Sequence, residues 1–305
     1  MTDAAALARR HFDADVVSSA PLTGGYTFDT RLLTLSDGRR VVFRTCADFD
    51  TGGGRRIVIR DVLEREKFFY DNANERIGPV CPRVCAVGGP AEYGAAYMFY
   101  DYIDGAPLDR CFGGLTAKQQ REAAYRHGEL AASVGMMEID AGHPYVTSRG
   151  RWQDYFADRL SERLKPLITI GMMTARDVDG LADGFRDKQL ERTLSFIHLD
   201  IRHGNMIYNG GDISLIDAEN CEFGDPLFEL AVTEMNGYHD EAFAAGYANI
   251  AGRRPETDSE LFYYYKLERL GLVLHVYLNE VRDASAAAPF VRQFNDVMKK
   301  LSSRV

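Results

Sequence analysis

The chain has 305 residues, of which 46% are hydrophobic and 27% charged, with a formal net charge of −9. This composition is ordinary for one large globular domain or two lobes, and the acidic balance argues against nucleic-acid binding, which depends on basic surfaces. No apolar run approaches the roughly 20 residues that span a bilayer, and the first residues lack the basic segment and apolar core of a signal peptide. We therefore expect a cytoplasmic protein with no nucleic-acid or membrane partner.

The five cysteines indicate a reducing compartment. They are odd in number, and only Cys81 and Cys85 have a spacing that resembles a metal site. A structural zinc ion needs four ligands, and no second cluster of Cys or His completes this pair. We expect free thiols in the cytosol.

The first hundred residues are rich in strand-like runs. They occupy residues 16–17, 30–35 and 40–45, and a Ser-Asp-Gly turn joins the last two. Gly24 and Gly25 lie ahead of these two runs. Their backbone N–H groups could lie over nucleotide phosphates, although an ordinary hairpin explains the same residues.

The pattern then changes from strands to helices. A helix is predicted over residues 59–76, where apolar positions recur at helical spacing, and strands are predicted at residues 84–87 and 96–102. Further helices are predicted at residues 117–137, 153–166, 226–237, 239–250, 258–282 and 289–301. A β-rich first third and an α-rich remainder predict an α+β protein of two lobes.

Polar side chains are concentrated between two short apolar runs, at residues 195–197 and 206–208. The five polar residues are His198, Asp200, Arg202, His203 and Asn205. An Asn-Gly-Gly-Asp turn follows, and a third apolar run ends on Asp217. The stretch therefore predicts a polar loop, a hairpin and a carboxylate at the far end of the hairpin.

Phosphoryl transfer requires such a set of side chains. Asp200 can orient a hydroxyl nucleophile and accept its proton. Asn205 and Asp217 can supply oxygen ligands to Mg²⁺, which often takes one or two carboxylates along with substrate phosphates. A lone His-x-Asp is common, and an aspartate after a strand usually solvates a turn. The whole combination, with Asn205 five residues after Asp200, favours the chemical interpretation.

The same stretch resembles the aminoglycoside phosphotransferase and choline kinase superfamily, which comprises the small-molecule relatives of protein kinases. HLDIRHGN at residues 198–205 is similar to the catalytic loop of that superfamily, and LIDAE at residues 215–219 to its metal-binding segment. GDPLFELA at residues 224–231 is similar to the segment that follows. Leu199 departs from the pattern, because the family usually has glycine before the catalytic aspartate.

The resemblance implies a protein-kinase-like fold of two lobes. Residues 1–100 would form a nucleotide-binding lobe with an antiparallel sheet and one main helix. Residues 101–305 would form a mostly helical catalytic and substrate-binding lobe, with a hinge at about residues 100–105. The backbone of Asp101, Tyr102 and Ile103 in this hinge would read the adenine edge.

The resemblance also implies roles for single residues. Arg44 would contact the nucleotide phosphates and pair with a glutamate of the following helix, for which Glu66 is favoured over Glu64. His198 and Asp225 would brace the catalytic loop. Support of the loop or contact with the substrate is expected of Arg202, His203 and Glu219.

An acceptor pocket is expected in the helical lobe. Acidic side chains there could meet the ammonium groups of a cationic substrate, although a solvated surface is the better explanation for most of them. These residues are Glu222, Glu229, Glu234, Asp240 and Glu268. The three consecutive tyrosines 263–265 are expected to pack in the core or at its boundary.

We therefore expect a kinase that transfers the γ-phosphate of ATP or GTP, with Mg²⁺, to a hydroxyl group of a small molecule. Family analogy favours an antibiotic of the aminoglycoside, peptide or nucleoside type, and hence resistance. The alternatives are a metabolite kinase for choline or amino alcohols, a non-catalytic pseudokinase, and a metal-dependent hydrolase that uses His198, Asp200, His203 and Asp217. A protein kinase is disfavoured, because the segment between Asp217 and Gly224 is too short for an activation loop.

Overall fold

The computed structural model describes residues 4–22, 27–50, 56–138, 140, 142–143, 150–190 and 193–303. Gly24 and Gly25 lie outside these residues. The chain divides into two compact units, one of Met1–Thr116 with His203–Cys221 and one of Ala117–Arg202 with Glu222–Val305. The first unit thus extends past the hinge expected at residues 100–105 and takes in a segment from the second half of the sequence.

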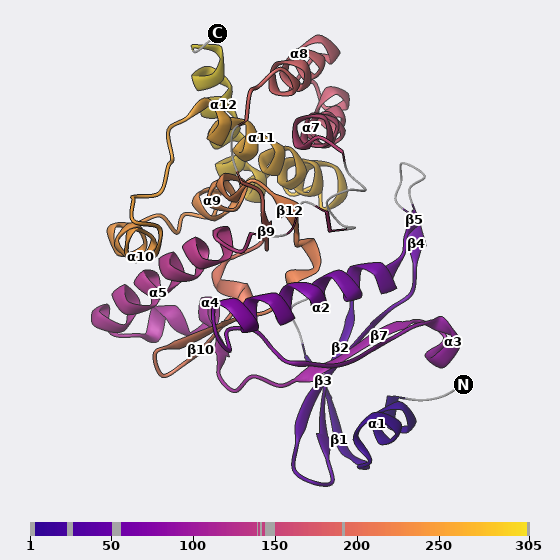
Figure 1. The fold of residues 1–305 in the computed structure, drawn as a ribbon. Helices are drawn as coiled ribbons and strands as arrows, with labels where there is room; N and C mark the ends of the chain where they lie inside the picture. Colours follow the sequence, from indigo (N-terminus) through magenta and orange to yellow (C-terminus); the bar gives the residue numbers. More distant parts are fainter. Residues whose placement is uncertain are drawn as a thin grey trace. The chain divides into compact units, whose positions relative to one another are not determined.

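A five-stranded antiparallel sheet forms the basis of the first unit (Figure 1). In spatial order its strands are β1 (Val16–Pro21), β2 (Asp29–Leu35), β3 (Arg40–Cys46), β7 (Ala96–Asp101) and β6 (Val84–Gly88). The predicted N-terminal antiparallel sheet is confirmed.

Two helices cover the opposite faces of this sheet. α1 (Ala4–Phe12) shares an apolar cluster with Phe43, and α2 (Ile59–Arg76) shares another with Val42. Successive residues of a strand point to opposite faces of a sheet. Arg44 therefore lies on the same face as Val42, toward α2.

Shorter elements complete the first unit. They are β4 (Phe49–Asp50), β5 (Arg56–Ile57), α3 (Pro90–Tyr93), β8 (Ala106–Pro107), α4 (Leu108–Cys111), η1 (Phe112–Gly114), η2 (His203–Asn205), β10 (Met206–Asn209), β11 (Asp212–Leu215) and η3 (Ala218–Asn220). β10 pairs with β11 on one side and with β8 on the other, so the hairpin predicted after the polar loop is present.

The second unit is mostly helical, as predicted. Its helices are α5 (Ala117–Gly135), α7 (Trp152–Thr169), α8 (Ala175–Arg186), α9 (Pro226–Met235), α10 (Glu241–Ala251), α11 (Glu260–His275), a π-helical turn η4 (Val276–Glu280) and α12 (Ala284–Ser302). Strands β9 (Ser195–Ile197) and β12 (Glu222–Gly224) form an antiparallel pair. α7 continues past Pro166, where the sequence predicted its end, because Leu164 and Leu167 on both sides of the proline are buried in the core.

Aromatic rings dominate the core of the second unit. Phe156 lies 4.4 Å from Phe185 and 4.8 Å from Tyr265, measured between ring centroids. The hydroxyl of Tyr265 accepts a hydrogen bond from Trp152 Nε1 over 2.9 Å. The three consecutive tyrosines 263–265 are at most 4% exposed, which places them in the core.

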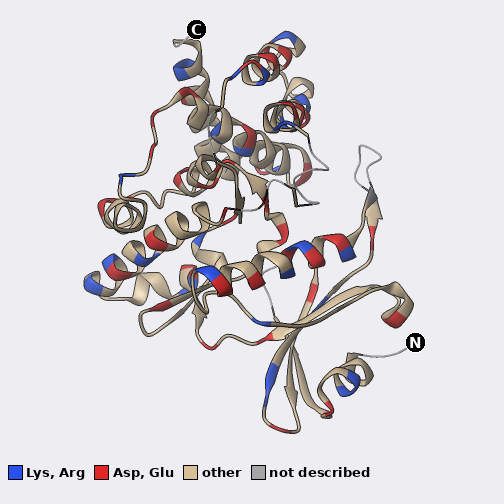
Figure 2. Ribbon diagram, in the orientation of Figure 1, with Lys and Arg blue, Asp and Glu red and all other residues tan. Residues whose placement is uncertain are grey.

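Charged residues of both signs alternate along α2 and α5 (Figure 2). Ion pairs one turn apart join Arg60 to Glu64 on α2 and Lys118 to Glu122 on α5, each over 3.6 Å. Such pairs are typical of a solvated helix face. In the described part of the chain, no helix combines the length and the apolar character needed to cross a membrane.

Candidate active site

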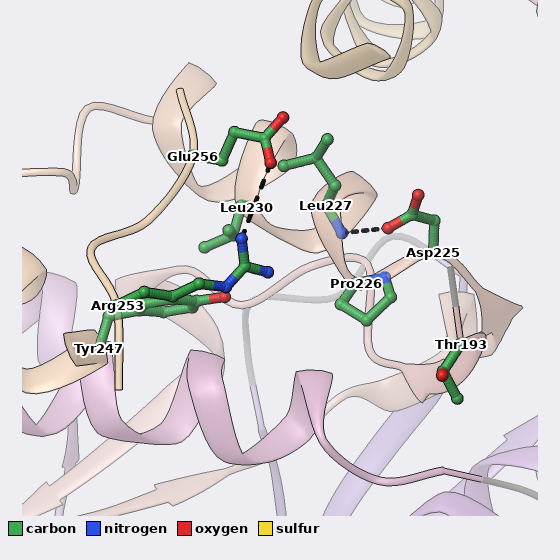
Figure 3. Close-up of a pocket in the computed structure, with 8 residues that line it drawn as sticks. All are labelled: Thr193, Asp225, Pro226, Leu227, Leu230, Tyr247, Arg253 and Glu256. Carbon is green, nitrogen blue, oxygen red and sulfur yellow. Dashed lines mark hydrogen bonds and ion pairs between the residues drawn. The ribbon is translucent and has the colours of Figure 1, made fainter. Parts of the chain in front are cut away.

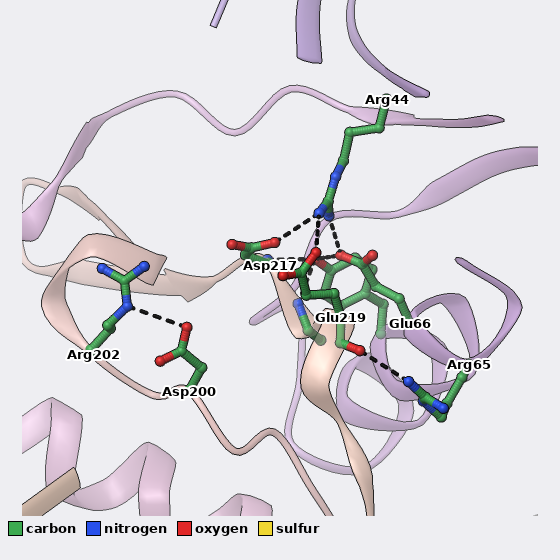
Figure 4. A network of polar contacts seen from close by, with 9 residues as sticks. Arg44, Arg65, Glu66, Asp200, Arg202, Asp217 and Glu219 are labelled. Carbon is green, nitrogen blue, oxygen red and sulfur yellow. Dashed lines mark hydrogen bonds and ion pairs between the residues drawn. The ribbon is translucent and has the colours of Figure 1, made fainter. Parts of the chain in front are cut away.

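One guanidinium gathers three carboxylates in the first unit (Figure 4). Arg44 of β3 donates from Nη1 to Glu66 Oε1 over 2.7 Å. From Nη2 it donates to Asp217 Oδ1 over 2.8 Å and to Glu219 Oε2 over 3.3 Å. The guanidinium is buried and lies 4.0 Å from the ring centroid of Phe28. The planar fork of arginine thus connects helix α2 to the segment that follows β11, a reach that a lysine ammonium lacks.

This cluster carries an excess of negative charge. Three carboxylates and one guanidinium leave a net charge of −2. Burial opposes the charge of Arg44, but Glu66 and Asp217 outweigh it and raise the pKa of Arg44 well above its usual value. The side chains of Asp217 and Glu219 keep 30% and 25% of their surface exposed, so a cation can reach them. The donor set fits Mg²⁺, which prefers oxygen ligands.

The β10–β11 hairpin brings Asn205 and Asp217 to one end of the ladder. Met206 pairs with Leu215, and the amide of Ile216 donates to the carbonyl of Asn205 over 3.0 Å. The two predicted Mg²⁺ ligands therefore lie on neighbouring segments of the first unit. Among the described residues, no group of three or more His, Cys, Asp or Glu side chains is placed to hold a metal ion. A magnesium ion here would take its other ligands from phosphate and water.

Asp200 lies in the second unit, in the polar loop after β9. Its Oδ2 accepts a hydrogen bond from Arg202 Nε over 3.2 Å (Figure 4). The preceding residue, Leu199, has a φ of 61°, in the left-handed region. Its amide donates to Glu229 Oε2 over 2.6 Å, and the amide of Ile201 donates to Glu229 Oε1 over 3.3 Å. The carboxylate of Glu229 on α9 therefore binds the amides on both sides of Asp200.

Three of the residues expected to support the loop, His198, His203 and Asp225, are buried. Burial raises the pKa of Glu229, whereas the neighbouring His198 and the two loop amides oppose this shift. Asp225 caps α9 by accepting from the amide of Leu227 over 2.8 Å. In the first unit, the ring of His203 packs 4.8 Å from that of Phe112, measured between centroids.

Two of the three hinge amides are already bonded within the first unit. The amide of Asp101 donates to the carbonyl of Arg83 over 3.0 Å, and the amide of Tyr102 donates to the carbonyl of Arg40 over 3.1 Å. Ile103 forms no such bond to any described residue. The amide that could read a nucleotide base in this segment is therefore that of Ile103.

Internal partners engage the five acidic residues expected to meet a cationic acceptor. Arg159 pairs with Glu222 over 2.9 Å and with Glu268 over 2.7 Å. Glu234 pairs with Lys266, Asp240 caps α10, and Glu229 holds the amides beside Asp200. Because these charges are neutralised or used inside the second unit, they do not form an open acidic surface.

A cavity of about 230 Å³ lies in the second unit, where β9 begins and β12 ends (Figure 3). Its charged groups are engaged with neighbours, since Arg253 and Glu256 form an ion pair over 3.9 Å and Asp225 caps α9. Pockets for drug-sized ligands usually measure about 300–1,000 Å³. The cavity is therefore too small and too well neutralised to be assigned to an acceptor.

Helix α2 makes two contacts with the segment that follows β11, and the sequence did not predict them. Tyr70 Oη bonds to the amide of Asp217, and Arg65 Nη2 donates to the carbonyl of Glu219 over 3.0 Å. The signal available in the sequence is the spacing of Tyr70, which lies four residues after Glu66 and hence on the same helix face.

Comparisons with known proteins agree with the interpretation of this site as that of a phosphotransferase. A sequence model described as the phosphotransferase enzyme family (APH) matches residues 19–263. A search of curated proteins finds no significant match.

Several solved structures share the fold over nearly the whole chain. A putative aminoglycoside phosphotransferase from Ralstonia eutropha JMP134 is 15% identical with a TM-score of 0.65, covering 97% of this chain and 95% of that one. A putative fructosamine-3-kinase from Thermobifida fusca YX-ER1 is 17% identical with a TM-score of 0.66, covering 99% of both. A thermostable mutant of APH(4)-Ia, in a ternary complex with AMP-PNP and hygromycin B, is 16% identical with a TM-score of 0.67, covering 97% and 98%. At these identities the likeness establishes the fold.

Proposed function

The chain belongs to the phosphotransferase enzyme family and is a phosphotransferase with a hydroxyl acceptor, and on this premise we propose that it transfers the γ-phosphate of ATP or GTP to a small molecule. The observation that carries the proposal is the buried guanidinium of Arg44, which joins Glu66 of the main helix to Asp217 of the metal-binding segment. Kinases use this connection between a basic strand residue, a helix glutamate and a metal-binding aspartate to hold a nucleotide.

In this proposal, the first unit binds the nucleotide. Arg44 contacts the phosphates, and Glu66 holds its guanidinium in place. Asn205 and Asp217 hold Mg²⁺, which when bound neutralises the charge on the phosphates. The amide of Ile103 donates a hydrogen bond to the nucleotide base, because the amides of Asp101 and Tyr102 already donate to backbone carbonyls of the first unit.

Asp200 acts on the acceptor. Its carboxylate orients the acceptor hydroxyl and receives its proton as the acceptor oxygen bonds to the γ-phosphorus and the bond from that phosphorus to the bridging β-phosphate oxygen breaks, which releases ADP or GDP. General-base assistance of this kind contributes about 10²–10⁴-fold, and positioning together with charge neutralisation supplies the remainder. Arg202, whose Nε donates to Asp200 Oδ2, would hold the carboxylate or meet a phosphate oxygen.

The acceptor we propose first is an antibiotic of the aminoglycoside, peptide or nucleoside type, whose phosphorylation would give resistance. Structural neighbours support this class, since one was solved with gentamicin and another with hygromycin B. A metabolite kinase for choline or amino alcohols is the second candidate. The observation that favours it is the internal pairing of Glu222 and Glu268, whose carboxylates already have Arg159 as a cationic partner.

The test is incubation of the protein with Mg-ATP or Mg-GTP and a panel of aminoglycosides, peptide and nucleoside antibiotics, choline and amino alcohols. Mass spectrometry then detects the gain of one phosphoryl group on an acceptor. Asp200→Asn should abolish the gain. Asp212→Asn, an exposed aspartate at the turn end of the β10–β11 hairpin, is the matched control and should retain it.

The outcomes separate the alternatives. Phosphorylation that is lost in Asp200→Asn and kept in Asp212→Asn supports the kinase and identifies its acceptor. Nucleotide binding without transfer to any acceptor, in wild type and both variants alike, would favour the pseudokinase. A protein that binds neither nucleotide would contradict the proposal.

A further inference from the structure

A single side chain of α2 reaches both the helix glutamate and the metal-binding segment. Tyr70 lies one turn after Glu66, and both residues are fully buried. The Tyr70 hydroxyl donates to Glu66 Oε1 over 2.6 Å and accepts from the amides of Asp217 over 2.8 Å and Ala218 over 3.4 Å. A phenol offers one donor and two acceptor positions, so these three bonds use its full capacity.

The backbone of Asp217 needs such a contact. Its φ of 64° lies in the left-handed region, which costs a non-glycine residue roughly 1–2 kcal/mol. The two preceding amides are held by backbone carbonyls, that of Leu215 by Val80 over 2.7 Å and that of Ile216 by Asn205 over 3.0 Å. The third amide of this series, that of Asp217, is held by the Tyr70 side chain.

The carboxylate of Asp217 is held separately. Arg44 binds Asp217 Oδ1, and the same Glu66 oxygen that accepts from Tyr70 accepts from Arg44 Nη1. In the proposed function Arg44 also serves the nucleotide phosphates. The bond from Tyr70 is directed at the backbone, so it does not compete with a metal ion or with phosphate for the carboxylate.

We propose that Tyr70 is a positioning residue for phosphoryl transfer, whose hydroxyl fixes the backbone of Asp217 so that its carboxylate points toward Mg²⁺. This inference rests on the proposed function, in which Asp217 is a ligand of the Mg-nucleotide. Tyr70 touches neither substrate nor metal, and acts through Asp217. Groups that orient a metal ligand in this way typically contribute about 10–100-fold to metal affinity or activity.

The chain offers a matched control in Tyr100. It is 8% exposed, and its ring lies 6.5 Å from that of Tyr70 in a T-shaped arrangement. The Tyr100 hydroxyl forms no hydrogen bond with any described residue. Tyr70→Phe and Tyr100→Phe therefore remove the same atom from neighbouring rings, but only the first change leaves the Asp217 amide without its acceptor.

The experiment is a calorimetric titration of ATP (or GTP, if only GTP binds) at a series of Mg²⁺ concentrations, with wild type, Tyr70→Phe, Tyr100→Phe and Asp217→Asn. We expect Tyr70→Phe to raise the Mg²⁺ concentration for half-maximal nucleotide binding by about 10–100-fold, with binding restored at high Mg²⁺. Tyr100→Phe should match wild type. A tyrosine that only packs the core would change the melting temperature without changing this Mg²⁺ midpoint.

The outcomes distinguish the inference from its premise. If Asp217→Asn weakens Mg²⁺-dependent binding while Tyr70→Phe keeps the wild-type midpoint, the role of Tyr70 is wrong and the proposed function stands. If Asp217→Asn leaves the midpoint unchanged, the metal role of Asp217 fails and the inference fails with it. Should Tyr70→Phe not fold, hydrogen exchange on wild type decides, because an Asp217 amide that exchanges as fast as a free peptide would overturn the bond to Tyr70.

Discussion

The amide of Leu199 donates a hydrogen bond of 2.6 Å to Glu229 Oε2, and this bond holds the residue before Asp200 in a left-handed conformation. Left-handed backbone disfavours any residue with a Cβ atom, so leucine is strained at this position and glycine would fit it without strain. The Leu199 side chain is fully buried in the core of the second unit. Packing and the bond to Glu229 therefore offset the strain that leucine introduces.

This balance predicts an unusual order of stability for two variants of Leu199. Leu199→Ala should lose about 2–5 kcal/mol of unfolding free energy, because it leaves a cavity and keeps the strained φ. Leu199→Gly leaves a similar cavity but relieves roughly 1–2 kcal/mol of strain, which exceeds the extra backbone entropy of glycine. Urea denaturation should therefore find the glycine variant at least as stable as the alanine variant. A glycine variant clearly less stable than the alanine variant would contradict the strained geometry.

Replacement of Arg44 by lysine should weaken nucleotide binding while keeping the charge. The arginine fork serves Glu66 with one nitrogen and Asp217 with the other, and a single ammonium group cannot span both. In the proposed function Arg44 also contacts the nucleotide phosphates, and loss of one charge-assisted hydrogen bond to phosphate costs about 1.5–3 kcal/mol, which corresponds to about a tenfold or larger rise in the dissociation constant for ATP or GTP. Titration calorimetry measures this dissociation constant.

The control for this substitution is Arg31→Lys on the neighbouring strand β2. Arg31 lies on the surface and pairs loosely with Asp29 over 3.9 Å. The Arg31→Lys variant should bind ATP or GTP with the same dissociation constant as wild type. Equal binding by Arg44→Lys and wild type would show that the fork is dispensable.

Two glycines of the helical unit should respond to alanine in opposite directions. A Cβ atom at Gly128 on α5 would lie 2.0 Å from the carbonyl oxygen of Phe243 on α10, a backbone atom that cannot move aside alone. Gly128→Ala should therefore destabilise the protein by about 1–3 kcal/mol or more. Gly180 on α8 is exposed with nothing within 4 Å of the added atom, so Gly180→Ala should stabilise by about 0.5–1 kcal/mol. Thermal melts of both variants test the close approach of α5 and α10.

Acid should destabilise the protein partly through His239. Burial, aided by the charge of Lys266, lowers the pKa of His239 to about 4, and its ring stacks on that of Phe243 with centroids 4.4 Å apart. The folded pKa lies below the unfolded value of 6.5, so this contribution is fully present above pH 6.5 and is lost as the pH falls toward about 4. A pKa difference of this size corresponds to about 3 kcal/mol.

The measurement compares wild type with His239→Gln in urea denaturation across this pH window. Glutamine stays neutral, so the stability of wild type relative to the variant should decline as the pH is lowered. A difference that is independent of pH would mean that His239 is not buried in its neutral form.

Much of the fold and part of the candidate site followed from neighbouring residues in the sequence. Strand and helix periods predicted the strands of the first unit, the helix that carries Glu66 and the helical remainder, because side-chain periodicity reports locally which face of an element is buried. The antiparallel sheet was implied by the family resemblance. The turn signal after the polar loop likewise predicted the β10–β11 hairpin, and the structure shows that this hairpin brings the segments of Asn205 and Asp217 together. The family motifs and the family match rest on these local signals.

The tertiary structure decided which distant groups share a bond. Tyr70 and Asp217 are 147 residues apart, and Leu199 and Glu229 are 30 residues apart, so no local pattern encodes either contact. The same holds for the pairing of Glu222 and Glu268 with Arg159, which turned two of the five expected acceptor contacts into internal partners. A buried polar group needs a partner, but the identity of that partner depends on which elements pack together. The spacing of residues in the sequence determined the helices and strands of this protein and the order of its motifs. Only the packing of these elements determined which distant side chains bond to the residues of the candidate site.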